Sequence, residues 1–106
     1  MGNPNVLCLV LDCLRLDAVT EADAPTIHAL AADNLSFDAC VTPANWSLPA
    51  HASLFTGEWP HDHGYYHREH HLDRLPLIEA LTDGGYETVG VTANIYASSS
   101  HGFDHG

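Results

Sequence analysis

The hydrophobic residues of this chain fall first into short runs with the pattern of β-strands. Residues 6–11 are continuously apolar, and a run of this length favours a strand buried on both faces, as in a parallel sheet. Residues 35–41 alternate imperfectly between apolar and polar positions and predict a second, shorter strand or an extended segment. Residues 86–92 have high β-propensity and predict a third.

Two segments between these runs carry the 3.6-residue period of a helix. One helix is predicted to begin with Pro25 in its first turn, to place Ile27 and Leu30 on one face, and to end at a left-handed Asn34. The other is predicted over residues 73–83, where two glycines end it. Strands and helices in this order predict an α/β fold built on a parallel sheet.

A further helix is predicted between Ser47 and Gly57. Ser47 is expected to be its N-cap, Pro49 lies in the first turn, where a missing N–H costs little, and Gly57 is expected to end the helix. A serine hydroxyl at the positive end of a helix suits an anion or an activated nucleophile. Ser47 is therefore either a cap alone or a cap that is also a nucleophile.

The charge of the chain narrows the classes of partner. Its 106 residues include 14 acidic side chains, three arginines and no lysine, which gives a net charge of −11. Nucleic acid is excluded as a partner because binding to phosphates needs basic residues. An acidic, lysine-free surface is typical of a halophilic protein, since high salt screens the repulsion between like charges.

Targeting signals and disulfides are not expected. The N-terminus lacks a basic region, and no apolar stretch approaches the ~18 residues of a membrane span, so we expect a cytoplasmic protein with no membrane partner. The three cysteines form no CxxC pair, and Cys8 and Cys13, which lie in or beside the first apolar run, are expected to be buried free thiols.

Two features could bind a metal ion. Asp12 follows the first predicted strand, at the sheet edge where ligands collect in open α/β folds, and is either a loop or capping residue or a metal ligand. A histidine-rich tract at residues 59–71 could bind zinc or nickel or could be a solvated polar loop. Its histidines are His61, His63, His67, His70 and His71. A serine hydrolase using Ser47 or Ser53 with His51 is a weaker alternative because no Gly-x-Ser-x-Gly elbow is present.

Two stretches, in order, resemble the sulfatases of the alkaline phosphatase superfamily. Asn5-Val6-Leu7-Cys8-Leu9-Val10-Leu11-Asp12-Cys13-Leu14-Arg15-Leu16-Asp17 resembles their opening strand. Ser47-Leu48-Pro49-Ala50-His51-Ala52-Ser53-Leu54-Phe55-Thr56-Gly57 resembles their nucleophile motif. The resemblance implies a three-layer sandwich around a parallel sheet. It also implies hydrolysis or transfer of a sulfate or phosphate ester at a metal-bound nucleophile.

The same resemblance implies roles for individual residues. Asp12 matches the first metal-binding aspartate, and Ser47 matches the nucleophile. Ser47 and His51 are accordingly the candidate catalytic residues, while Asp12 and Ser47 are the candidate ligands of a divalent Ca, Mn, Mg or Zn ion. We expect Asp12 and Ser47 to lie on adjacent loops within bridging distance of one ion.

The chain also departs from the sulfatase pattern. Cys13 stands where many members carry a second acidic ligand, Asn94 where they carry a lysine, and His51 where the motif has arginine. The loss of that arginine argues against formylglycine and favours an unmodified serine hydroxyl.

Sulfatases are several times longer than this chain, and their remaining metal ligands come from the distant carboxyl-terminal part. Residues 1–106 are therefore interpreted as the amino-terminal part of a sulfatase-like catalytic domain, an incomplete domain with weak or no activity alone. The expected partners are a small-molecule sulfate or phosphate ester and a separate chain that supplies the missing half. The alternative is a non-catalytic, histidine-rich metal-binding or interaction module that keeps the fold.

Overall fold

The computed structural model describes residues 2–105 of the chain. The chain divides into two units, Met1–Val41 and Thr42–Gly106. The first unit holds a 3₁₀ helix, η1 (Leu16–Ala18), and one α-helix, α1 (Pro25–Asp33). The second holds α2 (Ser47–Thr56), α3 (Pro60–His63), α4 (Pro76–Asp83), η2 (Ile95–Ala97) and η3 (Ser99–His101). None of the described helices is long and apolar enough to cross a bilayer.

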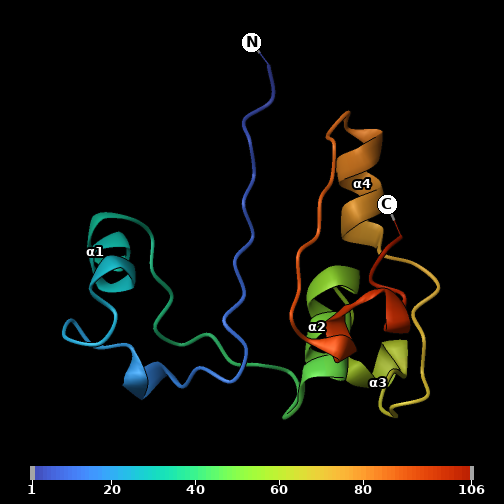
Figure 1. Ribbon diagram of the computed structural model, residues 1–106, viewed down its shortest axis with the longest axis horizontal. Coiled ribbons are helices and arrows are strands. Elements are labelled where there is room, and N and C mark those ends of the chain that lie inside the picture. Colours follow the sequence, from blue (N-terminus) through green and yellow to red (C-terminus); the bar gives the residue numbers. More distant parts are fainter. Residues whose placement is uncertain (1, 106) are drawn as a thin grey trace. The chain divides into compact units, whose positions relative to one another are not determined.

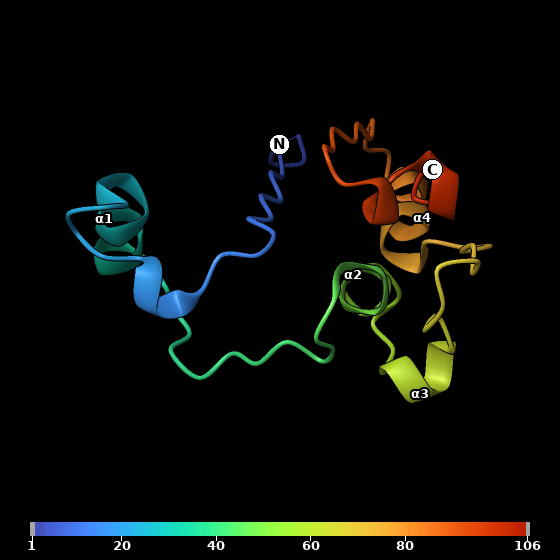
Figure 2. The same cartoon turned by 60° about the horizontal axis from the view of Figure 1, so that its bottom comes forward.

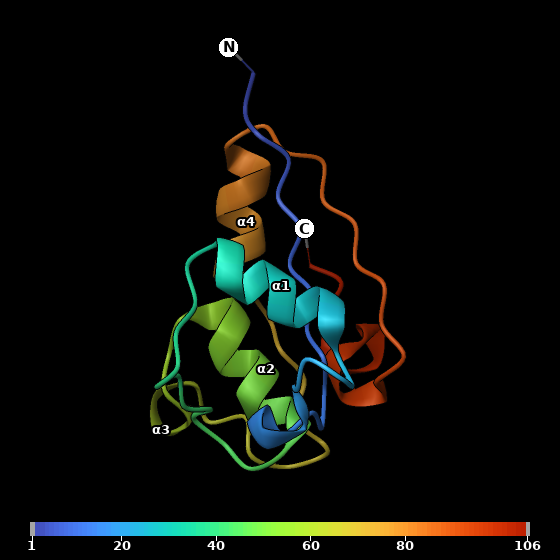
Figure 3. The same ribbon diagram turned by 90° about the vertical axis from the view of Figure 1, so that its left-hand side faces the viewer.

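The three predicted strands do not form, so the prediction of an α/β parallel-sheet sandwich is wrong. Residues 2–105 contain no β-strand, and their backbone hydrogen bonds include no ladder. Residues 86–92 run as an extended chain (Figure 3), with Val91 96% exposed, and Leu7 in the first run is 87% exposed. β-Branched and apolar residues favour an extended backbone, but a strand exists only where its N–H and C=O groups pair with a neighbouring strand.

The first unit confirms the helix predicted from Pro25 and corrects its end. Asn34 is extended, with φ −135° and ψ −174°, and not left-handed. Its side-chain amide donates to the Leu30 carbonyl oxygen at 2.9 Å, so it satisfies a last-turn acceptor without reversing the backbone. Leu30 is 59% exposed, and no residue of α1 is buried. Cys8 and Cys13, predicted to be buried free thiols, are free but exposed, and Cys40 is also free and exposed.

The second unit is built around α2, which Figure 2 shows nearly end-on. Leu48 and Ala52, one turn apart on α2, are fully buried against Leu72 and Leu75, which precede α4. Six partly buried side chains surround these four residues: Trp46, Phe55, Tyr65, Ile78, Tyr96 and Phe103. α3, α4 and η2 each pack against α2 (Figure 1).

The helices of the second unit follow local chemistry closely. The helix predicted between Ser47 and Gly57 is confirmed, and Gly57 ends it with φ +76°, a left-handed conformation that favours glycine. The helix predicted at 73–83 begins only at Pro76, whose fixed φ suits a first helical position. Residues 94–101 form two 3₁₀ turns, capped by the side chains of Asn94 and Ser98.

Candidate active site

Ser47 is the first residue of α2 and is half-buried. The residue at the N-cap is Trp46, which is extended and makes no side-chain cap bond, so the prediction of Ser47 as N-cap is wrong by one position. The Trp46 ring packs edge-on against Tyr96, with ring centroids 5.4 Å apart, and this contact holds the extended residue in place. Pro49 is compatible with any first-turn position and does not set the helix start.

His51 lies one helical turn beyond Ser47. Its Nδ1 is 2.8 Å from the Ser47 carbonyl oxygen, and because a carbonyl can only accept, Nδ1 donates. The ring also meets Phe103 edge-on, with centroids 6.3 Å apart. In the neutral ring this bond leaves Nε2 with a free lone pair. His51 can therefore accept a proton only through Nε2.

Asp12 lies in a tight turn of the first unit. Its Oδ1 accepts the Cys13 N–H at 3.0 Å, and Leu14 N–H donates to the Leu11 carbonyl oxygen at 3.4 Å. Cys13 adopts a positive φ of 61°, which is uncommon for a non-glycine residue and often marks a functional turn. Asp12 and Ser47 belong to different units, and their joint binding of one ion stays a prediction.

The histidine tract is structured by its own rings. Nδ1 of His63 accepts the Tyr65 N–H at 3.0 Å, and Nδ1 of His70 accepts the Tyr66 N–H at 3.1 Å. Nδ1 of His71 faces the Leu72 carbonyl oxygen at 3.0 Å. His63 and His70 accept a backbone N–H at Nδ1, so their neutral rings carry the proton on Nε2, and a metal would have to displace these bonds. His71 donates through Nδ1, so its Nε2 could bind a metal without losing that bond.

Ser53 pairs with His63 and not with His51. The Ser53 Oγ lies 2.9 Å from His63 Nε2, joining α2 to α3. Burial lowers the pKa of His63 below its ordinary value, partly opposed by the Pro49 carbonyl and by the charges of Glu58 and Asp62.

His101, which is 8% exposed, was not among the site residues predicted from the sequence. Its Nδ1 lies 2.9 Å from the Ile95 carbonyl oxygen and its Nε2 lies 3.0 Å from the Arg68 carbonyl oxygen. The sequence signal for the turns that carry His101 was the pair Asn94 and Ser98, residue types that often cap helical turns. Each side chain accepts the N–H two residues further on. His101 fixes the 65–71 loop to the carboxyl-terminal turns.

The donor set for a divalent ion is incomplete in the described residues. The Asp12 carboxylate and Ser47 hydroxyl are oxygen donors of the kind hard cations bind. Among residues 2–105, however, no group of three or more His, Cys, Asp or Glu side chains is placed to hold an ion. Asp12 and Ser47 alone do not complete a metal site, because Ca²⁺ takes six to eight ligands and Mg²⁺ takes about six.

Comparison with known proteins identifies the relatives of this chain. The sequence model of the family described as Type I phosphodiesterase / nucleotide pyrophosphatase matches residues 6–75, a span that includes Asp12, Ser47 and His51. The chain belongs to this family. The Type I phosphodiesterase family lies within the alkaline phosphatase superfamily, so the superfamily expected from the sequence is confirmed. The sulfatase subfamily stays a prediction. No curated protein and no solved structure matches the chain significantly.

Proposed function

We propose that this chain acts in the hydrolysis of a phosphodiester or nucleotide pyrophosphate bond, with Ser47 as the nucleophile. The observation that carries the proposal is the family match through residues 6–75, which spans both Asp12 and Ser47. The position of Ser47 supports it. The first residue of a ten-residue helix lies at the positive end of the helix dipole, which favours an anionic phosphoryl group.

The proposed step is a displacement at phosphorus. Ser47 Oγ forms a bond to phosphorus, the bond to the leaving alcohol or phosphate breaks, and water later releases the phosphoryl group from Ser47. The hydroxyl proton must leave as the new bond forms. His51 Nε2 can accept it, because Nδ1 of this ring is bonded to the Ser47 carbonyl oxygen and Nε2 carries the lone pair. A divalent ion held by Asp12 would lower the pKa of the hydroxyl and neutralise phosphoryl charge.

The test is an assay of the full chain with an aryl phosphodiester and, separately, an aryl sulfate, with Mn²⁺, Ca²⁺ or Zn²⁺ added. We expect the phosphodiester to be the better substrate and Ser47→Ala to lower turnover roughly a thousandfold or more. Ser53→Ala, on the same helix, is the matched control and should keep turnover within about threefold. Turnover that survives Ser47→Ala but is lost in Ser53→Ala would overturn the proposal. Faster turnover of the aryl sulfate than of the aryl phosphodiester would instead identify the substrate as a sulfuric ester.

A further inference from the structure

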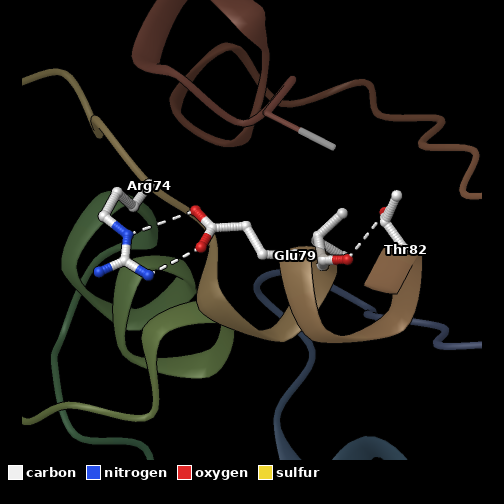
Figure 4. A network of polar contacts seen from close by, with 4 residues as sticks. Arg74, Glu79 and Thr82 are labelled. Carbon is white, nitrogen blue, oxygen red and sulfur yellow. Dashed lines mark hydrogen bonds and ion pairs between the residues drawn. The ribbon is translucent and has the colours of Figure 1, made fainter. Parts of the chain in front are cut away.

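Arg68 differs from the other two cationic side chains of this acidic protein. Arg15 forms two hydrogen bonds to Asp17, at 2.8 and 2.7 Å. Arg74 forms two to Glu79, at 3.4 and 2.7 Å (Figure 4). Arg68 forms no ion pair with a carboxylate anywhere in residues 2–105. In a chain with 14 acidic residues, a guanidinium kept away from them is available to an external anion.

Both ends of Arg68 are nevertheless held in place. Its guanidinium carbon lies 5.8 Å from the centroid of the Tyr96 ring, a cation–π distance. Its carbonyl oxygen is bonded by Nε2 of the buried His101 at 3.0 Å, and the His101 ring in turn lies 5.2 Å from that of Tyr96. A guanidinium at this distance from an aromatic ring can still donate N–H bonds to two oxygens of a tetrahedral anion.

The Tyr96 ring connects Arg68 to the start of α2. Tyr96 packs edge-on against Trp46, the residue that directly precedes Ser47, and η2 packs against α2. The Asn94 side chain accepts the Tyr96 N–H at 2.9 Å and so fixes the turn that carries the ring. The Tyr96 ring therefore contacts both Trp46, the N-cap of the nucleophile helix, and Arg68, whose guanidinium is the only one among residues 2–105 that forms no ion pair with a carboxylate.

We propose that Arg68, supported by Tyr96, binds the anionic phosphoryl group of the ester that Ser47 attacks. The inference rests on the proposed role of Ser47 and adds the residue that recognises the substrate charge. A phosphodiester carries a negative charge that a protein of net charge −11 repels, so a local cation is needed to bind it. Sulfate esters present the same tetrahedral oxyanion. Separate titrations with inorganic phosphate and inorganic sulfate distinguish a phosphate ester from a sulfate ester as the ligand.

The test is a titration of the ¹⁵N-labelled full chain with inorganic phosphate, and with inorganic sulfate, at constant ionic strength. The chain has three arginine Nε–Hε resonances, one per residue. The Arg68 resonance should move, while those of Arg15 and Arg74 stay still. Arg68→Ala should raise the Kd for phosphate roughly tenfold or more. This variant keeps the backbone carbonyl that His101 bonds, so the fold is retained.

Arg74→Ala is the matched control because it removes an equal charge from an exposed ion pair, and it should leave the Kd within about twofold. Arg68→Lys should recover part of the binding, because it keeps the charge but not the planar fork. With the phosphodiester substrate, Arg68→Ala should raise KM more than it lowers kcat.

Two results would overturn the inference about Arg68: an unchanged phosphate Kd in Arg68→Ala, or equal shifts of all three arginine resonances. Failure of the proposed function has a different signature. Ser47→Ala should abolish turnover and leave the phosphate Kd nearly unchanged. If turnover survives in Ser47→Ala while Arg68→Ala still loses phosphate, the nucleophile is wrong and the anion site stands.

Discussion

The Ser53 hydroxyl and the His63 imidazole lie 2.9 Å apart, and the hydrogen bond runs from the histidine to the serine. His63 Nδ1 accepts the Tyr65 N–H at 3.0 Å, so the proton of the neutral ring is on Nε2, which faces Ser53. A histidine that donates to a serine cannot take its proton. The pair therefore joins α2 to α3 and is not an activated nucleophile, which weakens the serine hydrolase alternative.

His63 should make the stability of the second unit depend on pH. Burial lowers its pKa in the folded state, so below about pH 6.5 the unfolded chain binds a proton that the folded chain does not. The free energy of unfolding should therefore be highest above pH 6.5 and fall as pH drops from there towards the folded pKa. Denaturant unfolding followed by tryptophan fluorescence would report it, because Trp46 and Trp59 both lie in this unit.

His63→Gln provides the control for that titration, since glutamine can still donate to Ser53 but carries no titrating proton. The fall in stability below pH 6.5 should be smaller in His63→Gln than in the parent chain. Equal slopes in the two proteins would assign the pH dependence to other groups.

Gly102 should be the least replaceable glycine of the second unit. It has φ +83°, and a Cβ at this position would lie 2.1 Å from the Leu72 carbonyl oxygen and 2.9 Å from His71 Nδ1. Gly102→Ala should therefore cost about 3 kcal/mol of unfolding free energy, from backbone strain and overpacking together. Gly57→Ala is the matched control, with φ +76° and open space around its Cβ, and should cost only about 1 kcal/mol. Similar losses in both variants would contradict the contact with Leu72.

Leu48 should dominate the stability of α2. Its side chain is fully buried with Leu72 and Leu75, and truncating a buried leucine costs about 2–5 kcal/mol. A unit of this size has a total stability of only a few kcal/mol, so Leu48→Ala should leave it largely unfolded at room temperature. Leu54→Ala, on the same helix but 46% exposed, should change stability by about 0.5 kcal/mol or less. Circular dichroism with denaturant would separate the two, and equal losses would place the core elsewhere.

The sequence predicted what local chemistry decides and missed what distant contacts decide. Pro25, Pro76 and Gly57 act within one helical turn, and the helices they bound lie close to the positions predicted. The run at 6–11 has the composition of a buried strand, yet composition does not provide the neighbouring strand that a ladder requires. A pattern of apolar residues identifies segments that can form strands, and it does not show which segments pair.

The same distinction applies to the site. The helix that carries Ser47 and His51 was predicted, because both residues lie within one locally determined element. The position of Trp46 as N-cap could not be predicted from the sequence, because the Trp46 ring contacts Tyr96, fifty positions along the chain. Arg68 and His101 were missed for the same reason, as their contacts span more than one loop.

Asp12 should hold a divalent ion more tightly than any acidic neighbour. It lies in the turn after residues 6–11, beside the left-handed Cys13, at the position that matches a metal-binding aspartate in the sulfatase resemblance. Asp17, five residues further on, forms an ion pair with Arg15 at 2.7 Å. Titration of Mn²⁺ into the ¹⁵N-labelled chain should broaden the Asp12 amide first, and Asp12→Asn should weaken Mn²⁺ binding roughly tenfold. Asp17→Asn is the matched control and should leave the affinity within about twofold, while EDTA should restore the sharp spectrum of the parent chain. Broadening confined to the histidine tract and unaffected by Asp12→Asn would instead support the histidine-rich binding module.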